Sequence, residues 1–424
     1  MFKSYIPKSI QCFREGYNKQ TFFNDLLAGL CVGIIALPLA LAFAIASGVE
    51  PERGLFTAIV AGFLISLLGG SRVQIGGPTG AFVVIVYATV QKHGYEGLVL
   101  ATFLGAALLI VMGLARLGSL LKYIPEAVIT GFTAGIAVVI ATSQIKDFFG
   151  LEGGAVPLDF VEKCLFLCQI ADTWKGSALL IALFTLILIF VLKRYFPKVP
   201  GAMLAIVLAS LSAYFLNLPL ETIHSKFGAL ASHLPAPSFP SFSFDQVKAV
   251  FPDAIAIALL GGIESLLSAV VADKMIGTRH KSNGELIAQG LANIGSALFG
   301  GIPATGAIAR TATNVRMGAK TPMAGMIHAV TLLLMMFFLA PLVGKIPLAT
   351  LAGTLLYVAW NMSDLPLFIT TLKSSREDAL LLITSFFLTI FIDLIVAVQA
   401  GVFIGTLLHL KRSKFGKKPL KTHL

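Results

Sequence analysis

The organisation of this chain is decided by the stretch Gly300-Gly301-Ile302-Pro303-Ala304-Thr305-Gly306-Ala307-Ile308-Ala309-Arg310. It is rich in glycine and carries a proline and an arginine, although the sequence around it is strongly apolar. A weaker copy lies far upstream, at Gly76-Gly77-Pro78-Thr79-Gly80-Ala81-Phe82. Both stretches run from Gly-Gly through Pro to Thr-Gly-Ala and then become helical in pattern. We interpret them as two interrupted membrane segments that face each other.

An extended segment followed by a helix start gathers unpaired backbone N–H groups and the positive end of a helix dipole at one point. Two such points near the membrane midplane make an anion site, and Arg310 would add a full positive charge. In membrane proteins, glycine pairs and prolines also occur for purely structural reasons, because they form loops or let helices pack closely. The correspondence between the two stretches favours a transporter site over that structural role.

Composition identifies an integral membrane protein. Hydrophobic residues make up 57% of the 424 residues and charged residues only 12%, whereas soluble domains carry roughly 25% charged residues. The mean hydropathy is +0.88. The net charge of +11 is spread over loops and chain ends. The excess of basic residues on the cytoplasmic side of membrane proteins explains this positive charge better than a nucleic-acid partner does. The N-terminal segment has no features of a cleavable signal.

The apolar stretches, and the glycines, prolines and charged residues between them, predict an all-α polytopic membrane protein with fourteen transmembrane segments. In the first half they are residues 25–47, 54–68, 78–90, 97–114, 127–148, 178–192 and 203–216. In the second half they are residues 247–271, 285–297, 300–315, 322–342, 348–360, 379–392 and 394–410. Segments three and ten are half-helices preceded by short strand-like pieces. Pro38 is expected to kink or unwind the first segment.

Seven segments per half invert the second half relative to the first. The predicted units are a cytosolic segment 1–21, a first repeat 22–216, a Pro- and Ser-rich linker 217–245, a second repeat 246–410 and a basic cytosolic tail 411–424. Basic residues gather in the loops that this topology places on the N-terminal side. We therefore expect a multi-pass protein of the inner (plasma) membrane with both termini in the cytoplasm.

Few residues in the predicted spans can carry chemistry. Glu264 is the most informative, because a charge deep in an apolar span is costly and marks a functional site by default. Ser268 lies one turn further on the same face. Glu264 and Arg310 could instead form an ion pair that braces two helices. The sequence contains no catalytic triad, no HExxH and no Walker loop, so an intramembrane enzyme and an ATP-driven pump are both disfavoured.

At these residues the chain resembles the SulP (solute carrier 26) family of anion transporters, over nearly all of residues 25–410. The resemblance is carried by the order and spacing of several strings: Gly33-Ile34-Ile35-Ala36-Leu37-Pro38-Leu39-Ala40-Leu41-Ala42-Phe43-Ala44, Gly76-Gly77-Pro78-Thr79-Gly80, Gly262-Ile263-Glu264-Ser265-Leu266-Leu267, Val271-Ala272-Asp273-Lys274-Met275 and Gly301-Ile302-Pro303-Ala304-Thr305-Gly306.

The resemblance implies two inverted seven-helix repeats arranged as a core and a gate domain, with an elevator-like movement of the core. It places the substrate between the starts of the third and tenth helices. The substrate-binding residues carried over are Leu39, Phe43, Pro78, Thr79, Ile308, Ala309 and Arg310.

The eighth and tenth helices resemble the bacterial bicarbonate and sulfate branch, and its cyanobacterial sodium–bicarbonate members most closely. An acid and a hydroxyl one turn apart bind sodium there, together with the start of the tenth helix. The corresponding residues are Glu264, Ser268, Gly306, Ala307 and Ile308, with Na⁺ expected at Glu264 and Ser268. This chain has Glu where those members have Asp, and Ile308 replaces a hydroxyl residue. Glutamate could carry a proton instead.

Together these observations predict a secondary transporter of a small anion, with bicarbonate or sulfate first and a dicarboxylate next. Uptake would be coupled to Na⁺ or H⁺, without any other cofactor. The expected partners are the anion and the lipid bilayer, with no nucleic acid, and a homodimer is left open. Most of the family ends in a cytosolic STAS domain, and this sequence is expected to lack one. A channel-like conductor, a nucleobase permease of the same architecture and a non-transporting scaffold are the alternatives.

Overall fold

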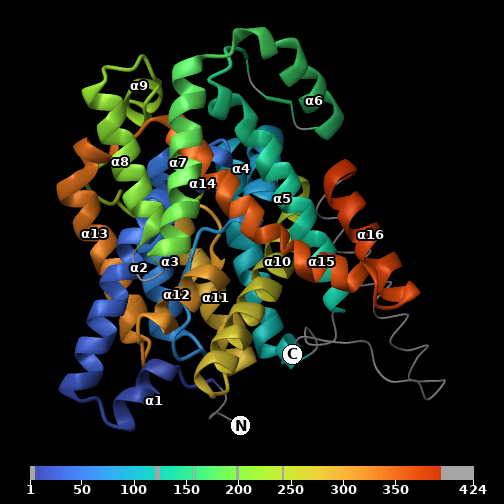
Figure 1. Cartoon of the computed structure of the whole chain (residues 1–424). Coiled ribbons are helices and arrows are strands. Elements are labelled where there is room, and N and C mark those ends of the chain that lie inside the picture. The colour runs from blue at the N-terminus through green and yellow to red at the C-terminus, as the bar shows by residue number, and fades with distance from the viewer. Residues whose placement is uncertain are drawn as a thin grey trace.

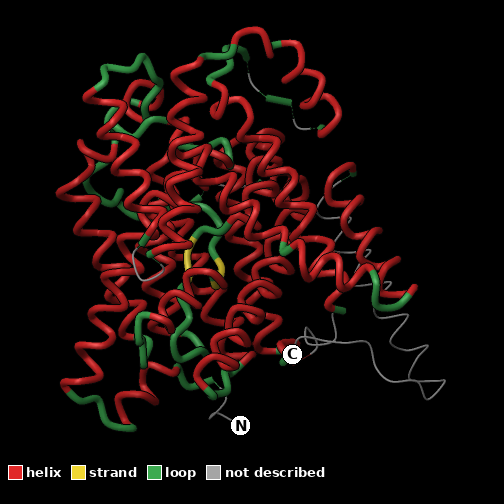
Figure 2. The backbone as a smooth tube through the Cα atoms, viewed as in Figure 1, coloured by secondary structure: helices red, strands yellow, loops and turns green. Residues whose placement is uncertain are grey.

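The structure, a computed structural model, describes residues 5–119, 125–154, 156–157, 159–196, 200–240 and 243–392. It is built almost entirely from helices, with two very short strands near its centre (Figures 1 and 2). The predicted last segment, residues 394–410, and the basic tail, residues 411–424, lie outside the described residues.

The first half of the chain contains eight of the described α-helices and the first strand. They are α1 (Lys8–Arg14), α2 (Lys19–Ala46), α3 (Pro51–Leu68), β1 (Gly76–Gly77), α4 (Gly80–Leu114), α5 (Glu126–Phe149), α6 (Phe160–Gln169), α7 (Gly176–Tyr195) and α8 (Gly201–Phe215). The second half follows the short helix α9 (Ile223–Phe227). It comprises α10 (Phe244–Ile276), α11 (Ser282–Leu298), β2 (Thr305–Gly306), α12 (Ile308–Arg316), α13 (Met323–Val343), α14 (Leu348–Ser363), α15 (Leu365–Leu372) and α16 (Arg376–Phe391).

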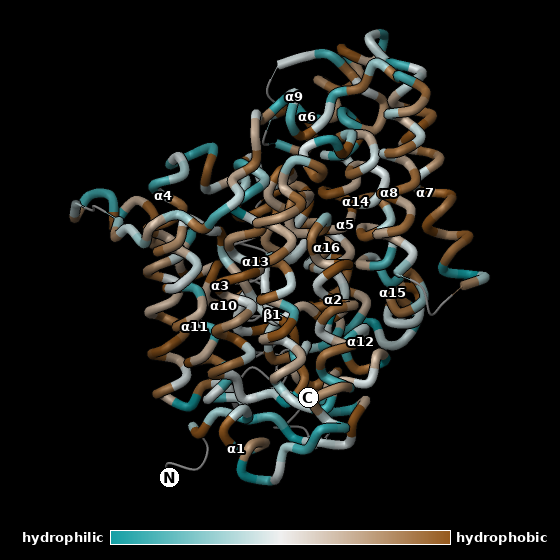
Figure 3. The backbone as a smooth tube through the Cα atoms, turned by 90° about the vertical axis from the view of Figure 1, so that its left-hand side faces the viewer, coloured by the Kyte–Doolittle hydropathy of each residue, from teal (hydrophilic) through white to brown (hydrophobic). Residues whose placement is uncertain are grey.

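Within the described part, seven helices are long and apolar enough to cross a membrane: α2, α3, α4, α5, α7, α10 and α13. Figure 3 shows hydrophobic residues along the helices through the middle of the molecule, with hydrophilic residues in the loops at its two ends. The N-terminus and α1 lie at one of these ends, and α6 and α9 lie at the other (Figure 1). This is the distribution expected of a chain that spans a bilayer.

The observed helices follow the predicted segments closely, with three differences. The predicted third and fourth segments form one assigned helix, α4, which breaks at Gly94, where φ is 69°. Of the kink or unwinding predicted at Pro38, the unwinding does not occur, since α2 is helical from Lys19 to Ala46. One proline removes a single backbone hydrogen bond, which a helix packed among others tolerates. Helices α6, α9 and α15 were not predicted.

The helices pack as two groups. In one group, α2 lies against α3 and α13, α4 lies against α10 and α11, and α3 lies against α11 and α13. In the other group, α5 lies against α14 and α16, and α14 lies against α7. Glycines allow the close approach: a Cβ at Gly131 of α5 would lie 2.3 Å from the carbonyl oxygen of Leu382 of α16. Close backbone contact at small residues is the usual way to pack helices in lipid.

A buried carboxylate ties the start of α2 to the loop before α13. Asp25 accepts hydrogen bonds from the backbone N–H of Lys320 at 2.7 Å, from the backbone N–H of Thr321 at 3.1 Å and from the Thr321 hydroxyl at 2.5 Å. The Tyr17 hydroxyl donates to it at 3.3 Å. Burial, together with the Asp25 charge, raises the pKa of Tyr17 to about 12, so its phenol stays neutral and remains a donor.

A second buried carboxylate, Glu285 of α11, organises the loop that leads into β1. It is 0% exposed and accepts four hydrogen bonds. The backbone N–H groups of Gly70 and Ser71 donate to Oε2 at 2.7 and 3.2 Å. The Ser265 hydroxyl and the Gln289 amide donate to Oε1 at 3.0 and 2.8 Å. One side chain therefore holds α3, α10 and α11 in register.

Replacing Glu285 with alanine should lower the Tm of the detergent-solubilised protein by about 5 °C or more. The reason is that four buried donors lose their acceptor, and each unsatisfied donor costs about 1–3 kcal/mol. Thermal denaturation followed by circular dichroism would measure the shift. Glu96→Ala, at an exposed carboxylate, is the matched control, and equal Tm values for the two variants would contradict the assignment.

Candidate functional site

The two glycine-rich stretches meet as an antiparallel pair of strands. Gly76 of β1 lies opposite Gly306 of β2, and Gly77 lies opposite Thr305. The backbone N–H of Ala307 extends the pairing by donating to the Ile75 carbonyl at 2.8 Å. Figure 2 shows the two strands side by side in the middle of the helices. Each strand runs directly into a helix, so the starts of α4 and α12 are brought to one place.

Neither helix start is capped by its own N-cap side chain. Thr79 precedes α4 and Ala307 precedes α12, and neither makes a side-chain cap hydrogen bond. The first N–H groups of a helix have no partner inside the helix. Two uncapped starts of this kind, each with its positive dipole end, provide donors and partial positive charge for an anion.

Glycine is required where the strands cross. A Cβ at Gly306 would lie 1.6 Å from the Gln74 amide nitrogen, and a Cβ at Gly76 would lie 2.2 Å from Cδ1 of Ile65. Gly77 has a φ of 145°, which side-chain-bearing residues rarely adopt. A Cβ at Gly77 would lie 2.8 Å from Nη1 of Arg310. The sequence can thus bring two backbones and a guanidinium together only with glycines at these positions.

Helix α10 supports the strand pair from behind. The Thr305 hydroxyl donates to the Gly261 carbonyl at 2.8 Å, and the Gln74 amide donates to the Ser265 hydroxyl at 3.0 Å. These two hydrogen bonds, together with the one between Glu264 and Thr79, hold α10 against both glycine-rich stretches.

Glu264 and Arg310 both contact the turn that starts α4. The Thr79 hydroxyl donates to Oε2 of Glu264 at 2.9 Å. Nη2 of Arg310 donates to the Pro78 carbonyl. Arg310 is 5% exposed, and its Nη1 has no hydrogen-bond partner among the described residues. No direct ion pair joins Glu264 and Arg310 there, so the two charges flank one turn instead of bracing each other.

The remaining predicted substrate residues lie around the same turn. Cε1 of Phe43 comes within 3.4 Å of the position that a Cβ at Gly80 would occupy. Leu39, one turn earlier on α2, is half-buried against the main core cluster. Ile308 is 37% exposed, and Ala309 is also exposed, although both begin a helix in the middle of the molecule. The start of α12 is therefore accessible from outside the protein, whereas Arg310 is buried behind it.

The predicted cation-coupling residues are near one another but differ in their contacts. Ser268 is fully buried, and its hydroxyl shares a 3.0 Å hydrogen bond with the hydroxyl of Thr311. Glu264, one turn away, is half-buried and bonds Thr79 instead. Gly306 and Ala307 are engaged in the strand pairing.

No group of three His, Cys, Asp or Glu side chains that could hold a metal ion occurs in the described part of the chain. A cation at Glu264 would therefore be bound by this single carboxylate with hydroxyl and carbonyl oxygens. Such a ligand set suits a weakly bound alkali ion better than a transition metal.

Several residues of the site were missed from the sequence. Thr311 accepts from the Ile75 N–H at 3.0 Å as well as bonding Ser268. The side-chain amide nitrogen of Asn293 in α11 donates to the Ala304 carbonyl at 2.8 Å, and its amide oxygen accepts from the Ala304 N–H at 2.7 Å. The available signal was the spacing of Glu285, Gln289 and Asn293 at intervals of four on one helix face.

Replacing Gly77 with alanine should destabilise the protein more than an ordinary glycine substitution at positive φ. The new Cβ would displace the Arg310 guanidinium in addition to straining the backbone, which alone costs about 1–2 kcal/mol. Gly228→Ala is the matched control, because Gly228 has a φ of 81° and nothing within 4 Å of its Cβ position. Differential scanning fluorimetry in detergent would compare them, and an equal fall in Tm would contradict the predicted clash.

Comparison with known proteins identifies the family of this chain. Residues 22–385 match the profile of the sulfate permease family. The chain is 46% identical over 399 residues to "Putative sulfate transporter YvdB" of Bacillus subtilis, covering 94% of this chain and 75% of that protein. It is 35% identical over 410 residues to the bicarbonate transporter BicA of Picosynechococcus, covering 93% of this chain and 72% of that protein.

Solved structures show the same fold. The transmembrane domain of a cyanobacterial bicarbonate transporter BicA superposes with a TM-score of 0.77 at 29% identity, covering 92% of this chain and 98% of that one. Murine Solute Carrier 26 family member A9 in its inward-facing state gives a TM-score of 0.85 at 20% identity, covering 97% and 72%. These relatives are transporters and not enzymes. The chain belongs to the sulfate permease (SulP, solute carrier 26) family of membrane anion transporters.

Proposed function

We propose that this protein is a secondary active transporter that carries sulfate or bicarbonate, with small dicarboxylates as the next candidates. The observation that carries the proposal is the strand pair, which sets two uncapped helix starts beside a buried guanidinium. The names of the relatives support the choice of anion, since they include a sulfate and a bicarbonate transporter.

The anion would bind between Phe43 on one side and the exposed start of α12 on the other. Backbone N–H groups at the starts of α4 and α12 would donate to its oxygens, with Leu39, Pro78, Thr79, Ile308 and Ala309 around it. Arg310 would attract the anion electrostatically without bonding it directly, because its guanidinium lies behind the Gly77–Pro78 backbone. A charge held in this low-dielectric position attracts an anion without clamping it, which suits release.

Glu264 would couple anion movement to a cation. Its carboxylate is half-buried and bonded to Thr79 at the very turn that receives the anion. A sodium ion bound at Glu264 and Ser268, or a proton on Glu264, would neutralise the carboxylate and make anion binding more favourable. Gly306, Ala307 and Ile308 would supply backbone atoms at this position.

The packing supports two inverted repeats of seven segments that move as a core and a gate. The first element of each half packs against a later element of the other: α2 against α13, and α10 against α4. Such interleaving is expected of inverted repeats. The α2–α4 and α10–α13 group would be the core, moving in an elevator-like manner against α5, α7, α14 and α16. We also propose that the N-terminal end faces the cytoplasm.

Replacing Arg310 with alanine should raise the KM for labelled sulfate or bicarbonate uptake into proteoliposomes by about tenfold or more, corresponding to roughly 1.4 kcal/mol of lost attraction. Arg310→Lys, which keeps the charge, should recover part of the affinity. Arg316→Ala is the control, because Arg316 is an exposed cation at the far end of the same helix. Wild-type kinetics in the Arg310→Ala variant would refute the assigned role.

Replacing Glu264 with glutamine should leave anion uptake unresponsive to imposed sodium or proton gradients, since the amide cannot change charge. Uptake would be measured in proteoliposomes with each gradient applied separately, which also identifies the coupling ion. Asp245→Asn, in the exposed first turn of the same helix, should behave as wild type. Gradient-driven accumulation that persists in Glu264→Gln would rule out coupling at this residue.

A further inference from the structure

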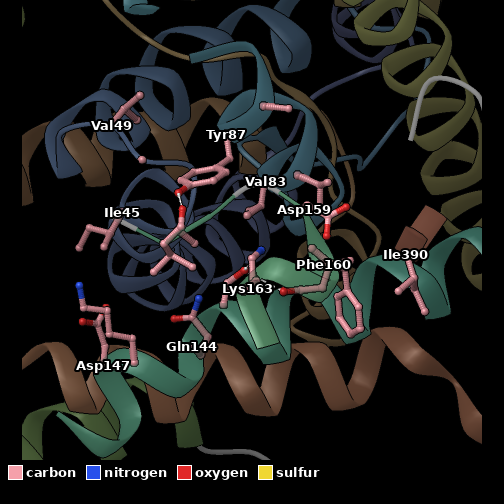
Figure 4. A pocket seen from close by; sticks show the side chains of 18 of the residues that line it. Ile45, Val49, Val83, Tyr87, Gln144, Asp147, Asp159, Phe160, Lys163 and Ile390 are labelled. Atoms are coloured by element: carbon pink, nitrogen blue, oxygen red, sulfur yellow. Dashed lines mark hydrogen bonds between the residues drawn. The ribbon is translucent and has the colours of Figure 1, made fainter. Parts of the chain in front are cut away.

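A second polar space lies away from the half-helix site. It is a cavity of about 510 Å³ (Figure 4). Its lining includes residues of α6 and α9, which lie at the end of the molecule opposite α1 (Figure 1). The end of α2 and the first turns of α4 form one wall, around Ile45 and Val83. The second half of α5, with α6 and the end of α16, forms the other. The cavity thus opens between the two groups of helices that would move against each other.

The lining carries more positive than negative charge. Its charged residues are Lys92, Lys146, Lys163, Lys226, Asp147 and Asp159. Most of these are already engaged within the protein. Lys226 pairs with Asp147 at 3.4 Å, and Lys146 donates to the carbonyls of Gly153 and Gly154, both at 2.7 Å.

Lys163 of α6 is different because its cation is buried without a counter-charge. Its side chain is 3% exposed, and its ammonium donates to the Ser143 hydroxyl of α5 at 3.1 Å. The ammonium lies 5.9 Å from the centre of the Tyr87 ring. No described carboxylate forms an ion pair with it. The adjacent acid, Glu162, is exposed, and Asp159, one helical turn earlier, caps α6 by accepting from the N–H groups of Val161 and Glu162 at 2.8 and 3.0 Å.

The orientation of α6 makes this burial informative. Val161 and Leu165 are 50% and 59% exposed, while Lys163 points inward toward the cavity (Figure 4). A short helix at a membrane surface would ordinarily direct its lysine to water. Burial lowers the pKa of Lys163, so the charged form is held at a free-energy cost that a bound anion would relieve.

The cavity also leads toward the half-helix site. Val83 in its wall is four residues from Thr79, about one helical turn or 6 Å along α4. Val139, in the opposite wall, precedes Ile140, whose Cδ1 comes within 3.3 Å of a Cβ position at Gly80. The wall of this cavity therefore comes within about one helical turn of the start of α4.

We propose that this cavity is a second binding site for a small oxyanion, which the Lys163 ammonium holds on its way to or from the half-helix site. The Ser143 hydroxyl, which donates to the Val139 carbonyl at 2.8 Å, positions the ammonium by accepting from it. The cavity's role in transport rests on the proposed function, but the binding itself does not. An ammonium has three N–H donors, of which Ser143 takes one, and tetrahedral or planar oxyanions accept several hydrogen bonds at once. The cavity is wide enough to admit a hydrated ion.

Reductive methylation with formaldehyde, followed by peptide mass spectrometry, tests binding on the wild-type protein without any need for transport. A rising sulfate concentration should slow methylation of Lys163 by about threefold once it reaches twice the Kd. Gluconate at equal ionic strength is the comparison for screening. Lys175, an exposed lysine paired with Glu152 at 2.7 Å, is the internal control and should not change. Equal methylation of Lys163 in sulfate and gluconate would overturn the proposal.

The same measurement on Arg310→Ala separates the two sites. Protection of Lys163 that persists in this variant supports an independent site, whereas protection that disappears would mean that sulfate acts from the half-helix site and would overturn the proposal. If vesicles with the wild-type protein took up neither sulfate nor bicarbonate, the proposed function would fail. The methylation result would still decide whether the cavity binds an oxyanion.

Lys163→Met should raise the KM for uptake from the side that bears the cavity by about tenfold, with little change in maximal rate, because charge attraction worth roughly 1.4 kcal/mol is lost. Lys163→Arg should retain the wild-type KM, and Lys175→Met is the surface control. An unchanged KM in a Lys163→Met protein with wild-type Tm would contradict the role in transport. If that variant fails to fold, the methylation experiment on the wild-type chain decides.

Discussion

The structure depends on one constraint: two backbone segments must cross inside a protein that spans lipid, where an unpaired N–H or C=O group is very costly. The antiparallel pairing of Gly76–Gly77 with Thr305–Gly306 satisfies those groups mutually. It also forces the following residues to begin helices at the same place. The candidate anion site is therefore a by-product of how the broken backbone is satisfied, and the surrounding side chains serve to keep that crossing in register.

That support is polar and almost wholly buried. Helix α10 reaches the strands through Ser265 and Gly261, and α11 reaches the flanking loops through Glu285 and Asn293. Ser265, Glu285, Asn293 and the Gly261 carbonyl each satisfy buried backbone or side-chain groups. Because a half-satisfied polar network is worse than an apolar one, its members can be changed only together. A rigid platform of this kind is what a site built from backbone N–H groups needs, since such groups cannot adjust by changing rotamer.

Much of this arrangement could be predicted from the sequence. The paired Gly-Gly-Pro-Thr-Gly pattern predicts both half-helices and the strands before them, because only glycine fits where Gly306 meets Gln74 and where Gly77 meets Arg310. The long apolar segments predict most of these helices to within a few residues at each end, and the likeness to a bicarbonate transporter structure confirms the helical membrane transporter fold.

Other features could not be predicted because they depend on three-dimensional neighbours. Nothing local shows that Ser268 bonds Thr311 instead of facing Glu264, or that Arg310 lies behind the backbone of the other half-helix. The inward direction of Lys163 is equally invisible, since its helix pattern fits a solvent-facing lysine. Helix α15 was missed because Leu365-Pro366 resembles a loop, although proline suits a first helical turn.

The Thr79–Glu264 contact has one more consequence. A hydroxyl can either give or receive a hydrogen bond, whereas a carboxylate can only receive one. When Glu264 is ionised, Thr79 must be the donor, as the 2.9 Å contact has it. A protonated Glu264 has one O–H donor and keeps its acceptor capacity, so it can either donate to Thr79 or go on accepting from it. The link between α10 and α4 would thus survive neutralisation, and the Thr79 hydroxyl would become free to reverse its O–H dipole beside the candidate anion site.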